Sequence, residues 1–90
     1  MEYRRFGNTI YLRLDPKEEI LEEIGKVAEK ENIRLAQVTG LGAINDFTAG
    51  VYNTVTKEYH SIQFQGAYEI VSLTGTVTRK DGDVYLCLLY

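Results

Sequence analysis

The sequence predicts an α+β fold, in which a mainly antiparallel β-sheet carries one principal amphipathic helix. Three observations lead to this prediction. A segment with apolar residues at every second position comes first, a segment with apolar residues at helical spacing follows, and about five segments rich in strand-forming residues complete the chain. Because these strands follow one another through turns and do not alternate with helices, an antiparallel sheet is favoured over a parallel one.

The predicted helix follows the first predicted strand, which covers residues 9–14 and has apolar side chains at alternate positions. Asp15 is placed to be the N-cap, Pro16 stands at the first helical position, and Glu18 completes a capping box in which aspartate replaces serine or threonine. We therefore expect the helix to begin directly after Asp15. Asn32 is a residue type that commonly ends a helix, and we expect it to do so here.

Five apolar residues form one stripe along this helix. They recur at helical spacing while charged residues occupy the other side, so the helix should lie with one face on the sheet. The stripe consists of Ile20, Leu21, Ile24, Val27 and Ala28.

The rest of the chain predicts five strands separated by short turns. β-Branched and aromatic residues dominate the strand segments, and glycine, asparagine and aspartate mark the turns. Residues 80–83, with the sequence Lys-Asp-Gly-Asp, predict a hairpin turn. The predicted strands cover residues 33–38, 44–52, 58–64, 68–79 and 84–90.

The composition is that of one folded domain covering residues 1–90. Hydrophobic residues make up 44% of the 90 residues and charged residues 26%, which argues against disorder. No segment has signal-peptide character or about 20 consecutive apolar residues, so neither secretion nor membrane insertion is predicted. The single cysteine, Cys87, cannot form a disulfide within the chain, and we expect a cytoplasmic protein.

The charge balance is slightly acidic. A net charge of -3 gives no general attraction for DNA, because nonspecific binding depends on lysine and arginine side chains that release counterions. If nucleic acid is a partner, a local basic patch has to make the contacts; the alternative is that these charges are ordinary solvated surface residues. The nucleic-acid candidates are Arg4, Arg5, Arg13, Arg79 and Lys80.

Two glycines one residue apart follow an apolar run. Backbone N–H groups at a glycine turn can bind an anion, which makes Gly40, Leu41, Gly42 and Ala43 a candidate ligand-binding segment. The third glycine of a dinucleotide-binding motif is absent, and a strand is predicted where that motif has a helix. A tight turn or a bend in a strand is therefore the alternative.

His60 is the only histidine and the remaining ligand-binding candidate. It shares a predicted strand face with Ile62 and Phe64, where a partly buried, hydrogen-bonded ring is the alternative. Cys87 is expected to be a small core residue. One histidine and one cysteine cannot complete the four ligands of a zinc site, so no metal or other cofactor is predicted for one chain, although a three-fold axis could gather three copies of one side chain around a metal.

The sequence does not predict catalysis. Its serine and threonine residues have only His60 as a classical base, and no serine lies in a G-x-S-x-G motif. The carboxylates of Asp81 and Asp83 are not a convincing catalytic pair, because the two residues flank Gly82, where aspartate favours a turn. We therefore predict a binding protein, with an enzyme acting on a small metabolite as a weaker alternative.

The last predicted strand, residues 84–90, is an apolar run without a polar tail. An uncovered strand of this kind invites pairing with another chain. We expect either that an oligomeric neighbour covers it or that the chain is a shortened form of a longer domain.

An ordered series of motifs resembles the plants-and-prokaryotes conserved (PPC) domain, which follows AT-hooks in plant nuclear proteins and stands alone in bacteria and archaea. The resemblance runs from about residue 13 to residue 88. The motifs that carry it are Gln37 to Ile44, Lys57 to Tyr59, Gly66 to Val77, Lys80 to Gly82, and Tyr85-Leu86.

The resemblance implies a homotrimer built on antiparallel sheet with one main helix, and a DNA-binding or transcription-associated role. DNA contact in the plant members comes from the AT-hook, which this sequence lacks, so the implied role is exerted as an assembly or through a partner. A Gly-Arg-Phe-Glu-Ile-Leu segment contacts protein partners in the plant members. The matching residues here, with alanine in place of arginine, are Gly66, Ala67, Tyr68, Glu69, Ile70 and Val71.

The resemblance does not carry a metal site into this sequence. Many bacterial relatives have a His-x-His pair where this chain has Cys87 and Leu89, and the family's C-terminal part with its Gly-Gly-His segment would follow Tyr90. Two functions stay open: a DNA-associated assembly, and a ligand- or metal-binding homo-oligomer with a site at subunit boundaries near residues 40–43 and His60.

Overall fold

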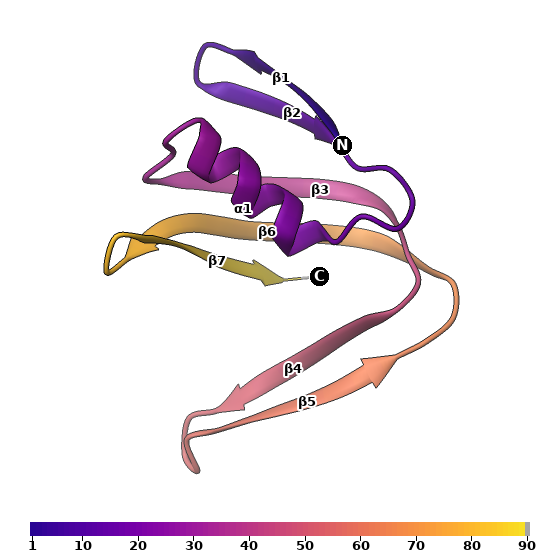
Figure 1. Ribbon diagram of the computed structural model, residues 1–90. Helices are drawn as coiled ribbons and strands as arrows, with labels where there is room; N and C mark the ends of the chain where they lie inside the picture. Colours follow the sequence, from indigo (N-terminus) through magenta and orange to yellow (C-terminus); the bar gives the residue numbers. More distant parts are fainter. Residues whose placement is uncertain (90) are drawn as a thin grey trace. The chain divides into compact units, whose positions relative to one another are not determined.

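A computed structural model describes residues 1–89, and this range contains seven strands and one helix (Figure 1). The predicted α+β fold with a mainly antiparallel sheet is confirmed. The elements are β1 (Glu2–Phe6), β2 (Thr9–Arg13), α1 (Ile20–Lys30), β3 (Ala36–Ile44), β4 (Phe47–Asn53), β5 (Glu58–Phe64), β6 (Tyr68–Lys80) and β7 (Asp83–Leu89).

The strands form two hairpins and one larger sheet. β1 pairs with β2 and β4 pairs with β5, both antiparallel, and β6 lies between β3 and β7 in a three-stranded sheet. The chain divides into two compact units. The first unit contains residues 1–38 and 75–88, and the second contains residues 39–74 with Leu89. Whether residues 1–90 behave as one domain stays a prediction.

The predicted strand of residues 9–14 corresponds to β2, and it pairs with a strand, β1, that the apolar pattern does not predict. Three of the five residues of β1 are charged, which hides the alternation. Gly7 adopts a φ of 62°, a left-handed conformation that glycine reaches without steric cost, and with Asn8 it forms the two-residue turn. The turn therefore specifies this hairpin more clearly than its strand residues do.

The helix begins later than predicted. α1 starts at Ile20, with Glu19 as its N-cap, because Asp15 and Glu18 close a separate turn ahead of it. The backbone N–H of Asp15 donates to the Glu18 carboxylate at 2.6 Å, and the N–H of Glu18 donates to the carbonyl of Asp15 at 3.2 Å. Lys17 within this turn has a φ of 74°, which cannot be continued as an α-helix. The Glu18 half of the predicted capping box thus forms, but it closes a turn and does not cap the helix.

The core of the first unit lies between α1 and the β6–β7 hairpin, where a Cβ atom on Gly25 would lie 3.9 Å from Cδ1 of Leu86. Val27 and Ala28 of the predicted stripe are buried on the helix, and Val77 is buried on β6, whereas Leu21 is exposed. Asn32 has a φ of 52° and ends the helix as predicted. Among residues 1–89, no large side chain is fully buried. The chain by itself therefore has a thin core, as expected for its length.

The last strand pairs with β6 through the predicted hairpin turn, in which Asp81 and Gly82 have positive φ. Along β7, Val84, Leu86 and Leu88 are half-buried, and the residues between them are exposed. Tyr90, the end of the predicted strand, lies outside the described residues. That a neighbouring subunit covers this strand stays a prediction.

Candidate functional site

The candidate ligand-binding segment of residues 40–43 lies inside β3 and is not a loop. Gly42 has a φ of 145°, which bends the strand in a conformation that glycine favours. A Cβ atom on Gly40 would lie 3.4 Å from Cδ2 of Leu73, so the missing side chain lets Leu73 pack closely. The strand-bend alternative thus describes the local structure.

His60 and Cys87 are both exposed, contrary to the partly buried ring and the core thiol that the sequence predicts. His60 lies on β5 opposite Val51 of β4. Within residues 1–89, no side-chain hydrogen bond or ion pair joins His60 to residues 40–43 or to a serine or threonine. The same range contains no group of three histidine, cysteine, aspartate or glutamate side chains that could hold a metal ion.

The β4–β5 ribbon has one apolar face. The register pairs Phe47 with Phe64, Ala49 with Ile62 and Val51 with His60, so these six side chains share one side of the ribbon. The other side carries Thr48, Gly50, Tyr52, Tyr59, Ser61 and Gln63. We call the first set, Phe47, Ala49, Val51, His60, Ile62 and Phe64, the ribbon face.

The ribbon face is packed at one end and open at the other. The rings of Phe47 and Phe64 stack with centroids 5.1 Å apart, and the ring of Tyr68 meets Phe47 edge-on at 5.3 Å. Toward the β4–β5 turn, Val51 is 74% exposed and Ile62 is 53% exposed. An apolar strand face exposed to this extent is typical of a surface that another molecule covers.

The segment that matches the plant partner-binding motif begins at this aromatic cluster. Gly66 has a φ of 123° and precedes β6, and the hydroxyl of Tyr68 donates to the carbonyl of Gln65 at 3.1 Å. Beyond it, Ile70 is half-buried, while Glu69 and Val71 are exposed, Val71 to 94%. Ala67 is also exposed. The segment is thus an accessible strand with apolar and acidic side chains.

Arg79, a nucleic-acid candidate, is held inside the first unit. Its Nε donates to the carbonyl of Ile33 at 3.0 Å and its Nη2 to the carbonyl of Ala28 at 3.3 Å. Nη1 contacts the Glu29 carboxylate at 3.0 Å and donates to the carbonyl of Gly82 at 3.3 Å. The guanidinium therefore fastens the end of α1 to the β6–β7 hairpin.

The other basic candidates differ in how far they are engaged. Arg5 contacts Glu31 at 3.1 Å, Arg13 contacts Glu2 at 3.4 Å, and the ammonium of Lys80 lies 5.7 Å above the ring of Tyr85. No carboxylate partner for Arg4 occurs among residues 1–89. The five residues thus do not form one free basic patch among residues 1–89, and Arg4 and Lys80 are the two of them that lack a carboxylate partner there.

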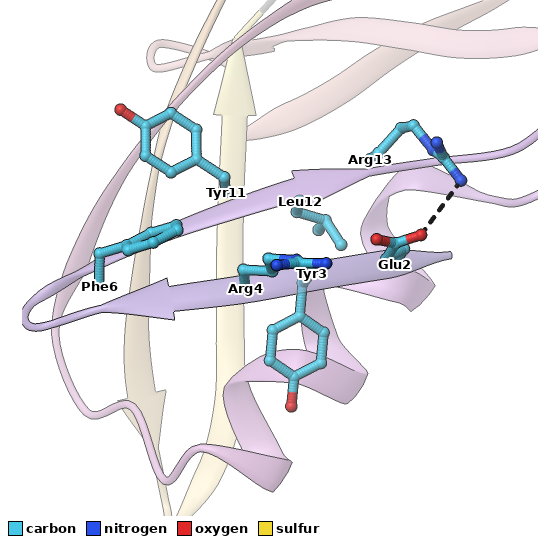
Figure 2. Close-up of a pocket in the computed structure, with 7 residues that line it drawn as sticks. All are labelled: Glu2, Tyr3, Arg4, Phe6, Tyr11, Leu12 and Arg13. Carbon is cyan, nitrogen blue, oxygen red and sulfur yellow. Dashed lines mark hydrogen bonds and ion pairs between the residues drawn. The ribbon is translucent and has the colours of Figure 1, made fainter.

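A shallow depression lies on the β1–β2 hairpin around Arg4 (Figure 2). Its volume is about 370 Å³. Apart from a leucine, its lining is charged and aromatic: Glu2, Tyr3, Arg4, Phe6, Tyr11, Leu12 and Arg13. The sequence singles out Arg4 and Arg13 but not Phe6 and Tyr11. Phe6 lies on β1, which the apolar pattern does not predict, and only the pairing of β1 with β2 brings it close to Tyr11.

These features define a small antiparallel α+β domain with exposed apolar and aromatic surfaces. Among residues 1–89, no helix is long and apolar enough to cross a membrane. The family model of the Plants and Prokaryotes Conserved (PCC) domain matches residues 1–89, and the chain belongs to this family. The resemblance inferred from the motifs is thereby confirmed.

Solved structures share this fold. A candidate DNA-binding protein from Bacteroides thetaiotaomicron is 29% identical, with a TM-score of 0.91 over 97% of this chain. A plant- and prokaryote-conserved (PPC) protein from Pyrococcus horikoshii is 34% identical (TM-score 0.81), and a metal-containing protein from Archaeoglobus fulgidus is 30% identical (TM-score 0.82), each over 86% of this chain. This chain spans 61%, 54% and 55% of those three chains, respectively. No curated protein matches it significantly.

Proposed function

We propose that this chain is a non-catalytic binding protein that works as a homotrimer and associates with DNA through that assembly or through a protein partner. The observation that carries the proposal is the ribbon face, on which Val51 and Ile62 are exposed. The family resemblance supplies the trimer, and the similar protein from Bacteroides thetaiotaomicron, described as a candidate DNA-binding protein, supports the association with DNA.

The ribbon face favours self-association for a physical reason. A two-stranded hairpin is marginally stable in water unless its apolar side packs against something. Covering an exposed valine or isoleucine stabilises the covered state by about 1.5–3 kcal/mol per side chain. Copies of the same chain can supply that cover on every subunit at once, because closed symmetry repeats one contact. We therefore assign the ribbon face to contacts between copies.

Charge limits how the assembly can contact DNA. Each chain carries -3, so three chains carry three times -3, or -9, and the whole assembly repels phosphate. Contact with DNA then depends on local cations or on a bound protein. The accessible residues 66–71 are the part of the chain that we assign to a protein partner.

The decisive experiment is the mass of the protein in solution at micromolar concentration. We expect about three times the 10.3 kDa chain mass. Ile62→Lys places a charge on the ribbon face and should shift the mass toward one chain, because burying an unpaired charge is costly. Leu35→Lys, at an exposed leucine outside the ribbon, is the matched control and should leave the mass unchanged. A wild-type monomer would refute the proposal.

A second candidate is a metal- or ligand-binding homo-oligomer with a site at subunit boundaries. His60 is exposed on the ribbon face, so an assembly through this face would bring several imidazoles close together. The similar protein from Archaeoglobus fulgidus is described as metal-containing. Metal content measured on the purified protein should fall on His60→Ala and stay constant on Cys87→Ala. Equal metal content in the wild type and both variants would exclude His60 and Cys87 as ligands.

A further inference from the structure

We propose that the outer face of the β1–β2 hairpin binds single-stranded DNA, with one base stacked on Phe6, another on Tyr11, and a phosphate held by Arg4. This inference rests on the proposed association with DNA, but it uses neither the ribbon face nor the assembly. We define the hairpin outer face by its six residues: Glu2, Arg4, Phe6, Thr9, Tyr11 and Arg13.

The strand register places these six side chains on one side. Glu2, Arg4 and Phe6 alternate along β1, and their partners on β2 are Arg13, Tyr11 and Thr9. The opposite side of the hairpin carries Tyr3, Arg5, Ile10 and Leu12. Aromatic rings and a cation are thus gathered on one side of two short strands.

The two rings form an exposed stacking surface. Phe6 is 60% exposed and Tyr11 is 70% exposed, although their centroids are 6.0 Å apart in an edge-on arrangement with an angle of 75° between the rings (Figure 2). The rings support each other and leave flat surface open to solvent. Bases of a single strand stack on such rings with little dependence on sequence, because every base has a π-face.

Arg4 provides the charge for a phosphate next to these rings. It lies directly opposite Tyr11, and it has no carboxylate partner among residues 1–89. Arg13, on the same face, contacts Glu2 at 3.4 Å and Asp15 at 3.7 Å, so its charge is compensated. A free arginine beside two exposed rings matches a ligand that joins a flat ring to an anion, which is the chemistry of a nucleotide.

The hairpin is held in place from its other side. The hydroxyl of Tyr3 donates to the Glu31 carboxylate at 3.0 Å, and Arg5 contacts the same carboxylate at 3.1 Å. The ammonium of Lys30 lies 5.9 Å from the centroid of the Tyr3 ring. These contacts anchor the hairpin to the end of α1, so the hairpin outer face is ordered before a ligand arrives. An ordered site avoids part of the entropic cost of binding.

The charge of the chain favours single strands over duplex. With a net charge of -3 and one uncompensated arginine on this face, counterion release can contribute little to affinity. The favourable term must then come from stacking, and the bases of a duplex are already stacked on one another. Binding through one phosphate also predicts a weak salt dependence, with a slope of log K against log salt of about -0.7.

The test is fluorescence anisotropy with a labelled twelve-nucleotide oligo(dT), a duplex of the same length and oligo(U), each at low and at moderate salt. We expect the full chain to bind oligo(dT) more tightly than the duplex. Tyr11→Ala and Phe6→Ala should each weaken binding about tenfold, because loss of one stacked base costs roughly 5- to 150-fold in affinity. Arg4→Gln should weaken binding and remove the salt dependence.

Two control variants separate stacking from folding. Tyr11→Phe keeps the ring and should keep the affinity. Tyr85→Ala removes another exposed tyrosine, 51% exposed against 70% for Tyr11, which lies under Lys80 on β7. This variant should bind like the wild type. Circular dichroism spectra of all variants check that the fold is intact.

Four outcomes would overturn the inference: no binding of oligo(dT) at low salt, equal binding of the duplex, tighter binding of oligo(U), or an equal loss of affinity in Tyr85→Ala. The solution mass of Phe6→Ala and Tyr11→Ala should equal that of the wild type. If the hairpin does not bind oligo(dT), the proposed trimer is unaffected. If the wild type is a monomer but still binds oligo(dT), only the proposed trimer is refuted.

Discussion

At the scale of single residues, Arg79 was a nucleic-acid candidate because it is basic, but its contacts give it a structural role. The side chain of Arg79 is 19% exposed, and its guanidinium donates to the carbonyl of Ala28 in the last turn of α1 and to that of Ile33 beyond the helix. The Ala28 carbonyl also accepts the backbone N–H of Ile33 at 2.9 Å. A cation at a helix C-terminus also interacts favourably with the helix dipole. Arg79 is thus engaged by backbone groups that a DNA phosphate would have to replace.

We expect Arg79→Ala to lower the free energy of unfolding by about 2 kcal/mol, because the Ile33 carbonyl loses this donor, the Ala28 carbonyl loses one of two donors, and the ion pair with Glu29 is removed. Urea denaturation monitored by circular dichroism measures the change. Arg79→Lys should restore only part of it, since an ammonium cannot reach several carbonyls as the planar guanidinium does. Lys80→Ala is the control and should change the free energy by less than about 0.5 kcal/mol. Equal urea midpoints for Arg79→Ala and Lys80→Ala would contradict this role.

At the scale of elements, Glu31 connects the β1–β2 hairpin to the end of α1. A hydrogen bond from Arg5 and a second one from Tyr3 hold the pKa of the Glu31 carboxyl below its usual range. The pKa of Tyr3 is raised, first by desolvation and then by its hydrogen bond to Glu31. The hairpin is therefore attached by groups that titrate at opposite ends of the pH range.

This connection predicts a pH dependence of stability. Because the pKa of Glu31 is lower in the folded chain, its contribution is fully present above the ordinary glutamate pKa and is lost as the pH falls through the folded value, from about pH 5 downward. The raised pKa of Tyr3 acts in the other direction, so its contribution is lost above about pH 10.

Urea midpoints measured from pH 7 to pH 3 on the wild type and Glu31→Gln test the acid side. Part of the wild-type loss of stability in acid should be absent in Glu31→Gln, while Glu58→Gln, at an exposed strand position, should follow the wild type. Other carboxylates with lowered pKa values, Asp15 and Glu18, keep the remaining acid dependence in all three proteins. Parallel pH curves for wild type and Glu31→Gln would disprove the contribution of this carboxyl.

At the scale of the whole molecule, few apolar side chains are buried and many large ones are exposed. Among residues 1–89, four apolar residues are buried, Val27, Ala28, Leu73 and Val77, whereas large hydrophobic side chains on the β4–β5 ribbon and on both edges of the three-stranded sheet are exposed. Exposed apolar surface of this extent is typical of a face that another molecule covers. The proposed trimer would cover this surface. It is argued from the exposed apolar surface as a whole and not from any single residue.

The sequence by itself determined the α+β class, the order of helix and strands from residue 9 onward, and the family. These features depend on local periodicity, on turn residues such as Gly82 and Asn32, and on an ordered set of motifs, all of which act over short stretches of chain. The start of α1 was predicted too early because the turn at residues 15–18 shares one hydrogen bond with a capping box, from the N–H of Asp15 to the Glu18 carboxylate.

Only the tertiary structure decided which candidate side chains are free. Arg79 is occupied by carbonyls that lie 46 and 51 residues away in the chain, and Phe6 meets Tyr11 through a strand register that apolar alternation does not reveal. His60 and Cys87 are exposed because nothing in the described chain covers these two side chains, although their neighbours in sequence are apolar. The periodicity of a sequence predicts which side chains lie on the same face of a helix or strand. What packs against that face depends on segments far away in the chain, and for this reason only the tertiary structure shows which side chains are exposed.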